Sequence, residues 1–500
     1  MNAPQSMPKQ DQDVSPFAGH SRGLWIGGEW LPATGGGLIE IVDPSTEEVI
    51  DAVPDATVED AAAAVEAAAR AAKGWRETPP RRRSEILRRC FELMNERSEV
   101  LASLISVENG KALRDARGEV GYAAEFFRWN AEEAVRISGE FALAPSGANR
   151  IIVDYEPMGV CVLITPWNFP AAMATRKIAP ALAAGCTVIL KPASETPLTA
   201  YALAALYQEA GVPPGVVNVL TTSAPGPVVA AMLKDPRVRK LSFTGSTGVG
   251  RTLLAEAARS VVSCSMERGG NAPFIVFDDA DLDAALDGSM IAKMRNAGEA
   301  CTAANRIYVQ SGLYDAFAKG LTERMAALKV GAGVSPETEC GPMITRKAVD
   351  KIDRLVADAV AQGARVLCGG SAAKVRGFYY PPTVLTDVPR AAEMTNEEIF
   401  GPVAPISRFE TESEVVEKAN DTEHGLAAYI YTRDISRGFR VAAQIEAGMI
   451  ALNRGLVSDP AAPFGGVKQS GLGREGGQRH GILEFMKAKY LAVALKSGVT

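Results

Sequence analysis

The sequence predicts an α/β fold with a doubly wound parallel sheet, a second α/β region and a small group of isolated strands. Between residues 160 and 250, short apolar runs alternate with helical stretches. Their spacing of about 25 residues is typical of parallel strands joined by helices. A second alternating series begins near Gly269, and two strand-like segments stand alone at residues 150–155 and 489–496.

The composition is that of an ordinary globular protein and excludes several functional classes. The chain has 500 residues, 47% of them hydrophobic and 22% charged, with a net charge of -6. This charge gives no reason to expect a nucleic acid or an anionic membrane as partner, and no apolar run reaches the ~18–20 residues that span a bilayer. Residues 1–22 are polar and lack targeting features, so we expect a disordered tail on a cytoplasmic protein.

The first 140 residues show no catalytic motif and are predicted to have a structural role. Residues 23–56 alternate short apolar runs with Gly and Pro, which predicts small antiparallel strands. Thr57 begins a capping-box-like pattern and predicts an alanine-rich helix that ends at Gly74. Two further helices are predicted at 82–107 and 119–138.

The next hundred residues predict the parallel sheet and a nucleotide site. Strands are expected at 160–164, 187–190, 216–220 and 240–243, with helices between them. Ligands bind at the carboxyl ends of such strands, and polar signatures follow three of the four. A helix that opens at Gly245 and Ser246 offers free N–H groups to a phosphate, and Lys191 suits a phosphate or ribose hydroxyls. The predicted cofactor-binding residues at these ends are Thr165, Pro166, Trp167, Lys191, Ser194, Glu195, Gly245 and Ser246.

The second α/β region carries a candidate nucleophile. Its strands are expected near 274–277, 306–310, 427–432 and 449–452. Cys301 has small neighbours, which leave room for an incoming carbonyl and for backbone N–H groups near the resulting negative charge. A literal G-x-G-x-x-G match at 471–476 follows no buried strand and is interpreted as a loop.

Cysteine and histidine usage argues against a disulfide framework and a metal site. The seven cysteines are scattered and show no metal-ligand spacing, and the chain has only three histidines. A Cys–His pair stays open, although we expect a carboxylate or the charge of a cofactor to assist Cys301.

Six ordered motifs closely resemble the aldehyde dehydrogenase superfamily over residues 24–495. They are Thr165–Pro170, Phe243–Ser246, Met266–Asn271, the segment around Cys301, Glu398–Val403 and Pro463–Gly471. The resemblance implies a dinucleotide-binding domain, a catalytic domain and a strand element that joins subunits into a dimer or tetramer. The corresponding ranges are 23–139 with 158–268, 269–481, and 140–157 with 482–500.

The resemblance also implies the catalytic roles. Cys301 attacks an aldehyde, and the amide of Asn168 with the N–H of Cys301 holds the oxyanion. After hydride transfer to the nicotinamide, Glu267 activates the water that hydrolyses the thioester. Lys177 is expected near the oxyanion side.

The nicotinamide end and the substrate tunnel are implied in the same way. Glu398 and Phe400 match positions that hold the nicotinamide ribose and ring. Phe464 and Trp167 match tunnel walls, with core packing as the alternative for both aromatics. Ser194 replaces a Glu that is frequent in NAD-preferring relatives, so NADP is slightly favoured over NAD, although Glu195 could restore repulsion.

Within the superfamily the nearest resemblance is to succinate-semialdehyde dehydrogenases. There, the positions of Arg176, Arg295 and Ser458 clamp the distal carboxylate of the substrate, a task that suits a guanidinium fork. The alternative is that either arginine forms a structural ion pair. Other possible substrates are glutarate semialdehyde, α-ketoglutarate semialdehyde and general aliphatic aldehydes. A coenzyme A-acylating enzyme, against which Glu267 argues, and a non-catalytic binding protein complete the alternatives.

Four residues depart from the family pattern. Arg268 stands where a Leu is usual and puts a charge beside the nicotinamide pocket. Glu299 is expected to add negative charge close to the thiol, Ala303 removes a second cysteine, and Arg454 replaces a commonly acidic residue.

Overall fold

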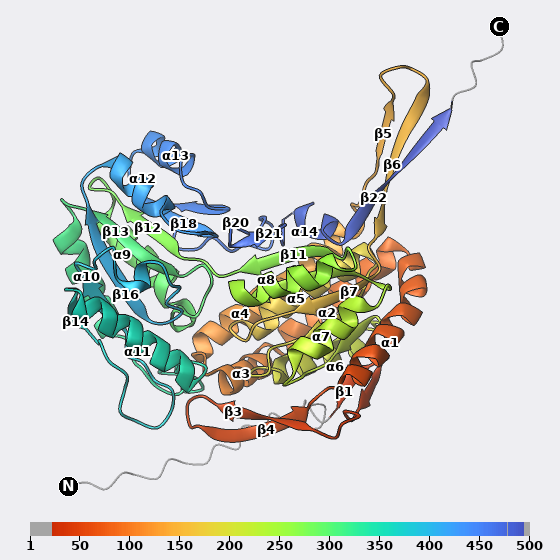
Figure 1. Ribbon diagram of the computed structural model, residues 1–500, viewed down its shortest axis with the longest axis horizontal. Coiled ribbons are helices and arrows are strands. Elements are labelled where there is room, and N and C mark those ends of the chain that lie inside the picture. Colours follow the sequence, from red (N-terminus) through yellow and green to blue (C-terminus); the bar gives the residue numbers. More distant parts are fainter. Residues whose placement is uncertain (1–22, 478, 495–500) are drawn as a thin grey trace.

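The computed structural model describes residues 23–477 and 479–494. The predicted tail, residues 1–22, and residues 495–500 of the predicted strand element lie outside the described residues. Two large sheets with helices on their faces form the body, and the fold is the predicted α/β class (Figure 1). None of the described helices is long and apolar enough to cross a membrane.

The first sheet has eight strands in the order β2-β1-β9-β8-β7-β10-β11-β21. Its centre is parallel, as predicted, whereas the strands at its two edges pair antiparallel. The central strands are β9 (Val217–Val219), β8 (Thr187–Lys191), β7 (Val160–Ile164), β10 (Val238–Gly245) and β11 (Ser263–Arg268). The edge strands are β1 (Leu24–Ile26), β2 (Glu29–Leu31) and β21 (Gly471–Leu472).

Alternate residues of the central strands enter two different cores. Val162 faces the core under α1 (Val58–Glu77), α7 (Pro225–Lys234) and α8 (Thr247–Ala258). Its neighbour Leu163 faces the opposite core. That core is built with α2 (Pro80–Glu96), α3 (Ser98–Asn109), α4 (Leu113–Glu133), α5 (Pro170–Ala184) and α6 (Leu198–Glu209). The fully apolar runs of the sequence are thus explained by burial on both faces.

The second sheet has seven strands in the order β14-β15-β16-β13-β12-β18-β19. They are β14 (Arg365–Cys368), β15 (Thr383–Thr386), β16 (Val403–Phe409), β13 (Ala304–Gln310), β12 (Ala272–Val276), β18 (Ala427–Tyr431) and β19 (Met449–Leu452). One face packs against α9 (Leu282–Met294), α10 (Tyr314–Ala326) and α11 (Arg346–Ala361). The other packs against α12 (Glu412–Asn420) and α13 (Ile435–Ala442). This lobe occupies the left of Figure 1.

The two isolated strand segments of the sequence pair with each other. β22 (Met486–Ala494) pairs antiparallel with β6 (Asn149–Pro157), and β5 (Glu140–Leu143) completes a three-stranded sheet. This sheet projects from the body as an arm (Figure 1). Small elements complete the described chain: β3 (Leu38–Asp43), β4 (Glu48–Pro54), β17 (His424–Gly425), β20 (Val467–Lys468), α14 (His480–Leu483) and the single-turn helices η2 (Arg295–Gly298) and η3 (Glu393–Thr395).

Several predicted boundaries differ from the observed ones. The predicted single helix at 82–107 is two helices, because Arg97 leaves the helical region with φ −112° and ψ 21°. The predicted helix at 119–138 begins six residues earlier, at Leu113, and ends at Glu133. Within the predicted loop at 471–476, Gly471 and Leu472 form strand β21 on the edge of β11. The Thr57 capping box is present, with Asp60 as its partner.

Candidate active site

A cavity of about 890 Å³ lies where the carboxyl ends of β7, β8 and β10 face the second lobe. All but two of the predicted site residues line it. They are Thr165, Pro166, Trp167, Asn168, Arg176, Lys191, Ser194, Glu195, Gly245, Ser246, Arg295, Cys301, Glu398, Phe400, Ser458 and Phe464. Lys177 and Glu267 are not part of this lining. One continuous space therefore joins the expected cofactor residues to the candidate nucleophile.

A strained turn presents Cys301 to this cavity. Asn296, Ala297 and Gly298 have φ values of 53°, 51° and 78°, so three consecutive residues are left-handed. The side-chain amide of Asn296 donates to the backbone oxygens of Asn168 and Glu299, at 2.9 and 3.1 Å, and this ties the turn to the loop after β7. The small residues around Cys301 are thus part of a tight, buried turn. The sequence analysis had explained them only as leaving room for an incoming carbonyl.

Burial and nearby charges act in opposite directions on the Cys301 thiol. Burial raises its pKa to about 12, and Arg176 and Arg295 act against that shift, whereas Glu398 and Glu267 add to it. At neutral pH the thiol of this state is protonated. A base or a bound cation has to favour the thiolate before attack.

Two hydrogen bonds fix Asn168 in the wall of the cavity that Cys301 also lines. Its side-chain Nδ2 donates to the carbonyl of Glu299 at 2.9 Å, and its backbone carbonyl accepts from Lys111 Nζ at 2.8 Å. Lys111 forms a fully buried ion pair with Glu119. Because Nδ2 carries two hydrogens and one is used, the second is available to the cavity.

Glu267 lies behind the cavity in a buried cluster of charges. Neither carboxyl oxygen has a hydrogen-bond partner among the described residues, and the side chain packs against Gly465, where an added Cβ would lie 2.7 Å from Oε1. Burial and then Glu475 raise the pKa of Glu267 well above its usual value, and Lys177 acts against them. This arrangement therefore favours the protonated form of the Glu267 carboxyl group more than water would.

Lys177 differs most from its expected place. Its Nζ forms a buried ion pair with Glu475 and donates to Ser242 Oγ at 3.0 Å, away from the cavity lining. Glu475 lies in a motif that the sequence singled out, but no role was predicted for it. The sequence does contain a signal for this pair, because a lysine in an apolar helix such as α5 needs a buried carboxylate as its partner.

Two arginines enter the cavity from different elements. Arg176, on α5, donates to Tyr122 Oη at 2.7 Å and stacks 4.0 Å over the Phe464 ring. Its Nε and Nη1 have no hydrogen-bond partner among the described residues, although Glu475 Oε2 lies 3.7 Å from Nη1. Arg295, at the end of α9, stacks 5.0 Å over Phe169. Tyr122 and Phe169 also line the cavity and were not predicted.

The opposite end of the cavity offers groups that suit a dinucleotide. Lys191 is buried, and this lowers its pKa, whereas Glu195 acts in the other direction. Ser246 caps α8 by accepting from the N–H of Val249. The Ser194 hydroxyl donates to the carbonyl of Thr222 at 3.3 Å, so it presents an oxygen lone pair unless it turns.

Glu398, Phe400 and Trp167 form the region between the two ends. Burial raises the pKa of Glu398 to about 7, and the N–H of Gly270, which donates at 3.2 Å, acts against this. Phe400 is left-handed with φ 55°, and its ring meets Trp167 edge-on at 5.4 Å. Lys347 and Lys351 line the same stretch and were missed by the sequence analysis.

The expectation that Glu299 adds negative charge near the thiol is wrong, because its carboxyl group is buried and points elsewhere. Its carboxyl group points to the N–H of Ile344, which donates at 3.2 Å, and burial raises its pKa to about 8. Glu299 is thus neutral at pH 7. Arg454 is exposed, outside the cavity lining, and Ala303 is buried.

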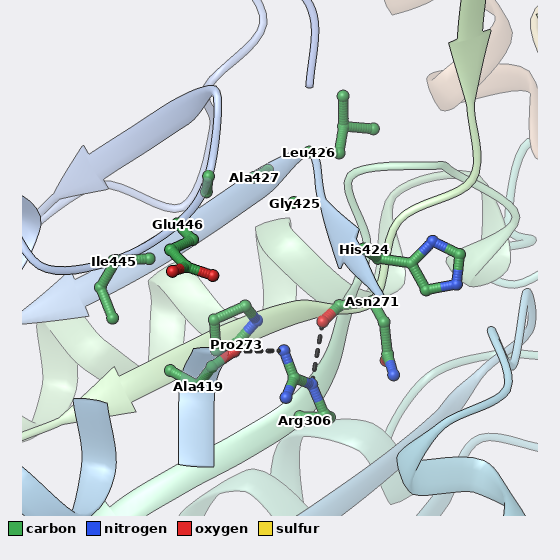
Figure 2. Close-up of a pocket in the computed structure, with 11 residues that line it drawn as sticks. Asn271, Pro273, Arg306, Ala419, His424, Gly425, Leu426, Ala427, Ile445 and Glu446 are labelled. Atoms are coloured by element: carbon green, nitrogen blue, oxygen red, sulfur yellow. Dashed lines mark hydrogen bonds between the residues drawn. The ribbon is translucent and has the colours of Figure 1, made fainter. Parts of the chain in front are cut away.

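A second, very small cavity holds His424 away from the nucleophile (Figure 2). Its volume is about 10 Å³, and Arg306 spans it by donating to the carbonyls of Asn271 and Ala419, each at 2.9 Å. This arginine serves the fold. No histidine of residues 23–477 or 479–494 lines the large cavity, so a Cys–His pair involving His424 or His480 is not supported.

Comparison with known proteins gives a consistent result. Residues 30–491 match the model of the aldehyde dehydrogenase family. A succinate-semialdehyde dehydrogenase from Paenarthrobacter nicotinovorans is 54% identical over 439 residues, covering 88% of this chain and 97% of that protein. A glutarate-semialdehyde dehydrogenase from Pseudomonas putida is 51% identical, with 94% and 97% covered. The crystal structure of an E. coli NADP-dependent enzyme matches with a TM-score of 0.94 and 49% identity, over 96% and 99% of the two chains.

Proposed function

Since this chain belongs to the aldehyde dehydrogenase family, we propose that it oxidises succinate semialdehyde to succinate with NADP or NAD. The choice of substrate rests on one observation: Arg176 and Arg295 line the same cavity as Cys301. Two guanidinium groups in the cavity that Cys301 lines favour an aldehyde that carries a carboxylate at its far end.

The residues supply a complete route from aldehyde to acid. The Cys301 sulfur adds to the carbonyl carbon, and Asn168 with the backbone N–H of Cys301 holds the oxyanion. A donor of this kind typically contributes about 3–4 kcal/mol of transition-state stabilisation. A nicotinamide held by the cofactor residues would supply the hydride acceptor, and loss of the hydride from the carbon on Cys301 leaves a thioester there. Water attacks that thioester, the C–S bond breaks, and the acid leaves.

Glu267 is proposed to take the proton from the hydrolytic water after its side chain turns toward Cys301. Its carboxyl oxygens have no partners to give up on leaving the buried cluster. A raised pKa suits a general base that has to accept a proton near neutral pH. In this proposal Lys177 and Glu475 are positioning residues, because they balance the charge around the Glu267 carboxyl group.

The cavity fits a dinucleotide cofactor. Lys191 and the N-terminus of α8 provide positive charge and N–H donors, and Glu398 provides an acceptor for ribose hydroxyls. NADP is placed first because Ser194 leaves the 2′ position without the repulsion of a glutamate at that site. The similarity to the E. coli NADP-dependent enzyme supports this order.

Glutarate semialdehyde is the second candidate substrate. The similarity to the Pseudomonas putida glutarate-semialdehyde dehydrogenase, at 51% identity, favours it specifically. Both substrates carry a distal carboxylate and differ by one methylene, which is worth only about 1–3 kcal/mol of discrimination in a pocket.

A panel of aldehydes with and without a terminal carboxylate tests the proposal. We expect kcat/KM for succinate semialdehyde to exceed that for butanal by about 100-fold, on the order of 3 kcal/mol. Arg295→Met should remove most of this preference, with a much larger loss on succinate semialdehyde than on butanal; the smaller loss on butanal reports the effect of Arg295 on the Cys301 thiolate. Arg176→Lys keeps a positive charge beside Glu475 but removes the guanidinium fork. It therefore separates recognition of the substrate carboxylate from the stability of the folded protein. Equal rates on the two aldehydes in the wild type would show that the arginines serve the fold.

The organisation of the chain is part of the proposal. We propose a dinucleotide-binding domain of residues 23–139 and 158–268, and a catalytic domain of residues 269–481. The element of residues 140–157 and 482–500, whose described part includes the arm, is proposed to join subunits into a dimer or tetramer. A cytoplasmic location stays a prediction of the sequence.

A further inference from the structure

We propose that Arg268 binds the pyrophosphate of the dinucleotide, together with the N-terminus of α8. This inference rests on the proposed function, because it assigns a further residue to the cofactor site.

Arg268 is placed on the cofactor side of β11. Adjacent residues of a strand point to opposite faces, and Glu267 occupies the face toward α5 and Lys177. The aliphatic part of Arg268 lies over the first turn of α8, where a Cβ added at Gly250 would meet its Cδ at 2.7 Å. Arg268 lines the large cavity together with Gly245 and Ser246.

One nitrogen of the Arg268 guanidinium is buried without a partner. Arg268 is 6% exposed, its Nε has no hydrogen-bond partner, and residues 23–477 and 479–494 offer it no ion pair closer than 4 Å. The nearest cation, Arg251, is exposed and pairs with Glu423 at 3.3 Å. The buried Nε–H has lost water without gaining an acceptor, which is costly, and a phosphate bound in the cavity that Arg268 lines would supply one.

The N-terminus of α8, which lies next to Arg268, also favours an anionic ligand. α8 has twelve residues and begins at Thr247, after the Ser246 cap. The first amides of a helix have no intrahelical acceptor and carry the positive end of the helix dipole. A cation and a helix N-terminus that border one cavity form a site for a single anionic group.

The order of the strands decides which phosphate this is. Lys191 and Ser194 follow β8, and β11 is separated from β8 by β7 and β10. At roughly 4.8 Å between strands, the two ends lie about 14 Å apart. The 2′-phosphate belongs beside Ser194, whereas the pyrophosphate reaches the end of β10 and the start of α8, beside Arg268.

Binding of cofactor fragments to Arg268→Leu tests the proposal by calorimetry, without turnover. We expect the Kd values for NADP, NAD and ADP-ribose to rise by the same factor, about 10- to 100-fold, since hydrogen bonds to charged groups are worth ~1.5–3 kcal/mol. The Kd of adenosine 2′-monophosphate should not change. Arg268→Lys should recover part of the affinity, and Arg251→Leu, which removes an exposed charge from α8, should stay within about twofold of wild type.

Each other outcome has a definite meaning. If only NADP and adenosine 2′-monophosphate lose affinity, Arg268 binds the 2′-phosphate and the assignment to the pyrophosphate is wrong. If no fragment loses affinity while Tm falls, Arg268 is a packing residue and the inference is overturned. Failure of the wild-type protein to bind any dinucleotide would instead contradict the proposed function.

Discussion

At the scale of single residues, the site contains acidic groups whose ionisation is disfavoured by burial. Cys301 and Glu267 are both proposed to react as anions, yet burial raises the pKa of each. Arg176 and Arg295 oppose the shift at Cys301 without cancelling it. The reaction therefore starts from a neutral Cys301 thiol, and burial also disfavours the charged form of Glu267, so the cavity has to be filled before both groups react as anions.

Alkylation of Cys301 by iodoacetamide measures this directly. At pH 8 a thiol with a pKa of about 12 has on the order of 1,000-fold less thiolate than a free cysteine. We expect alkylation of the unliganded protein to be at least about 100-fold slower than that of free cysteine, and to rise steadily from pH 7 to pH 10. Cys301→Ala supplies the background of the other cysteines. A rate that levels off below pH 8 would contradict the raised pKa.

Single residues that a motif fixes on the backbone lie where the sequence predicted a site. Asn168 and Lys191 line one cavity because they stand at the carboxyl ends of β7 and β8, and Cys301 reaches the same cavity from the turn before β13. The sequence did not identify the Lys177–Glu475 pair, because the pairing depends on which buried carboxylate a distant segment brings. The neutral state of Glu299 likewise depends on its contact with Ile344, which no local pattern encodes.

At the scale of elements, β11 and the turn before Cys301 organise the site. β11 places Glu267 toward the buried charges and Arg268 toward the cofactor side, so one strand serves both halves of the reaction. The turn requires glycine at one position, because Gly298 is left-handed and packs against the carbonyl of Gly401.

Gly298→Ala should damage both stability and catalysis. Its Cβ would lie 2.2 Å from the Gly401 oxygen, in addition to the ~1–2 kcal/mol cost of a left-handed residue. Displacement of Cys301 by about 1 Å should lower kcat by about 100-fold. Gly211→Ala is the matched control, because Gly211 is also left-handed, at φ 84°, but has open space. It should lower Tm less and leave kcat unchanged; equal effects of the two variants would contradict the role of the clash.

Elements with strong local signals were predicted, and those defined by tertiary contacts were not. The apolar runs of β7 and β8 and the Thr57 capping box gave correct elements. The break at Arg97 has no proline or glycine to mark it and was missed. β11 was seen only as a motif, since its sequence, Ser-Cys-Ser-Met-Glu-Arg, shows no clear alternation.

At the scale of the whole molecule, the arm exposes apolar side chains to water. Phe141 is 70% exposed, and Leu143, Tyr490 and Leu491 are also exposed. The outer edges of β5 and β22 carry no neighbouring strand within the described residues. A free three-stranded arm with open edges and exposed apolar residues is typical of a surface that pairs with another chain.

Light scattering tests this interpretation of the arm. The wild-type protein should be a dimer or tetramer, and the double substitution Phe141→Lys and Leu491→Lys should reduce its mass to that of a smaller species. Val261→Lys is the control, because Val261 is 86% exposed and lies between α8 and β11, outside the three strands of the arm. A monomeric wild type, or a variant with unchanged mass, would contradict the proposed role.

The buried pair of Lys177 and Glu475 has a consequence for how the protein is made. The two residues are 298 positions apart, so a ribosome completes the first parallel strands long before it adds the carboxylate that they enclose. Domains generally fold in order of synthesis. Until the later segment arrives, α5 holds an ammonium group with no counter-charge, and a nascent chain in this stage should depend on chaperones more than the finished protein does.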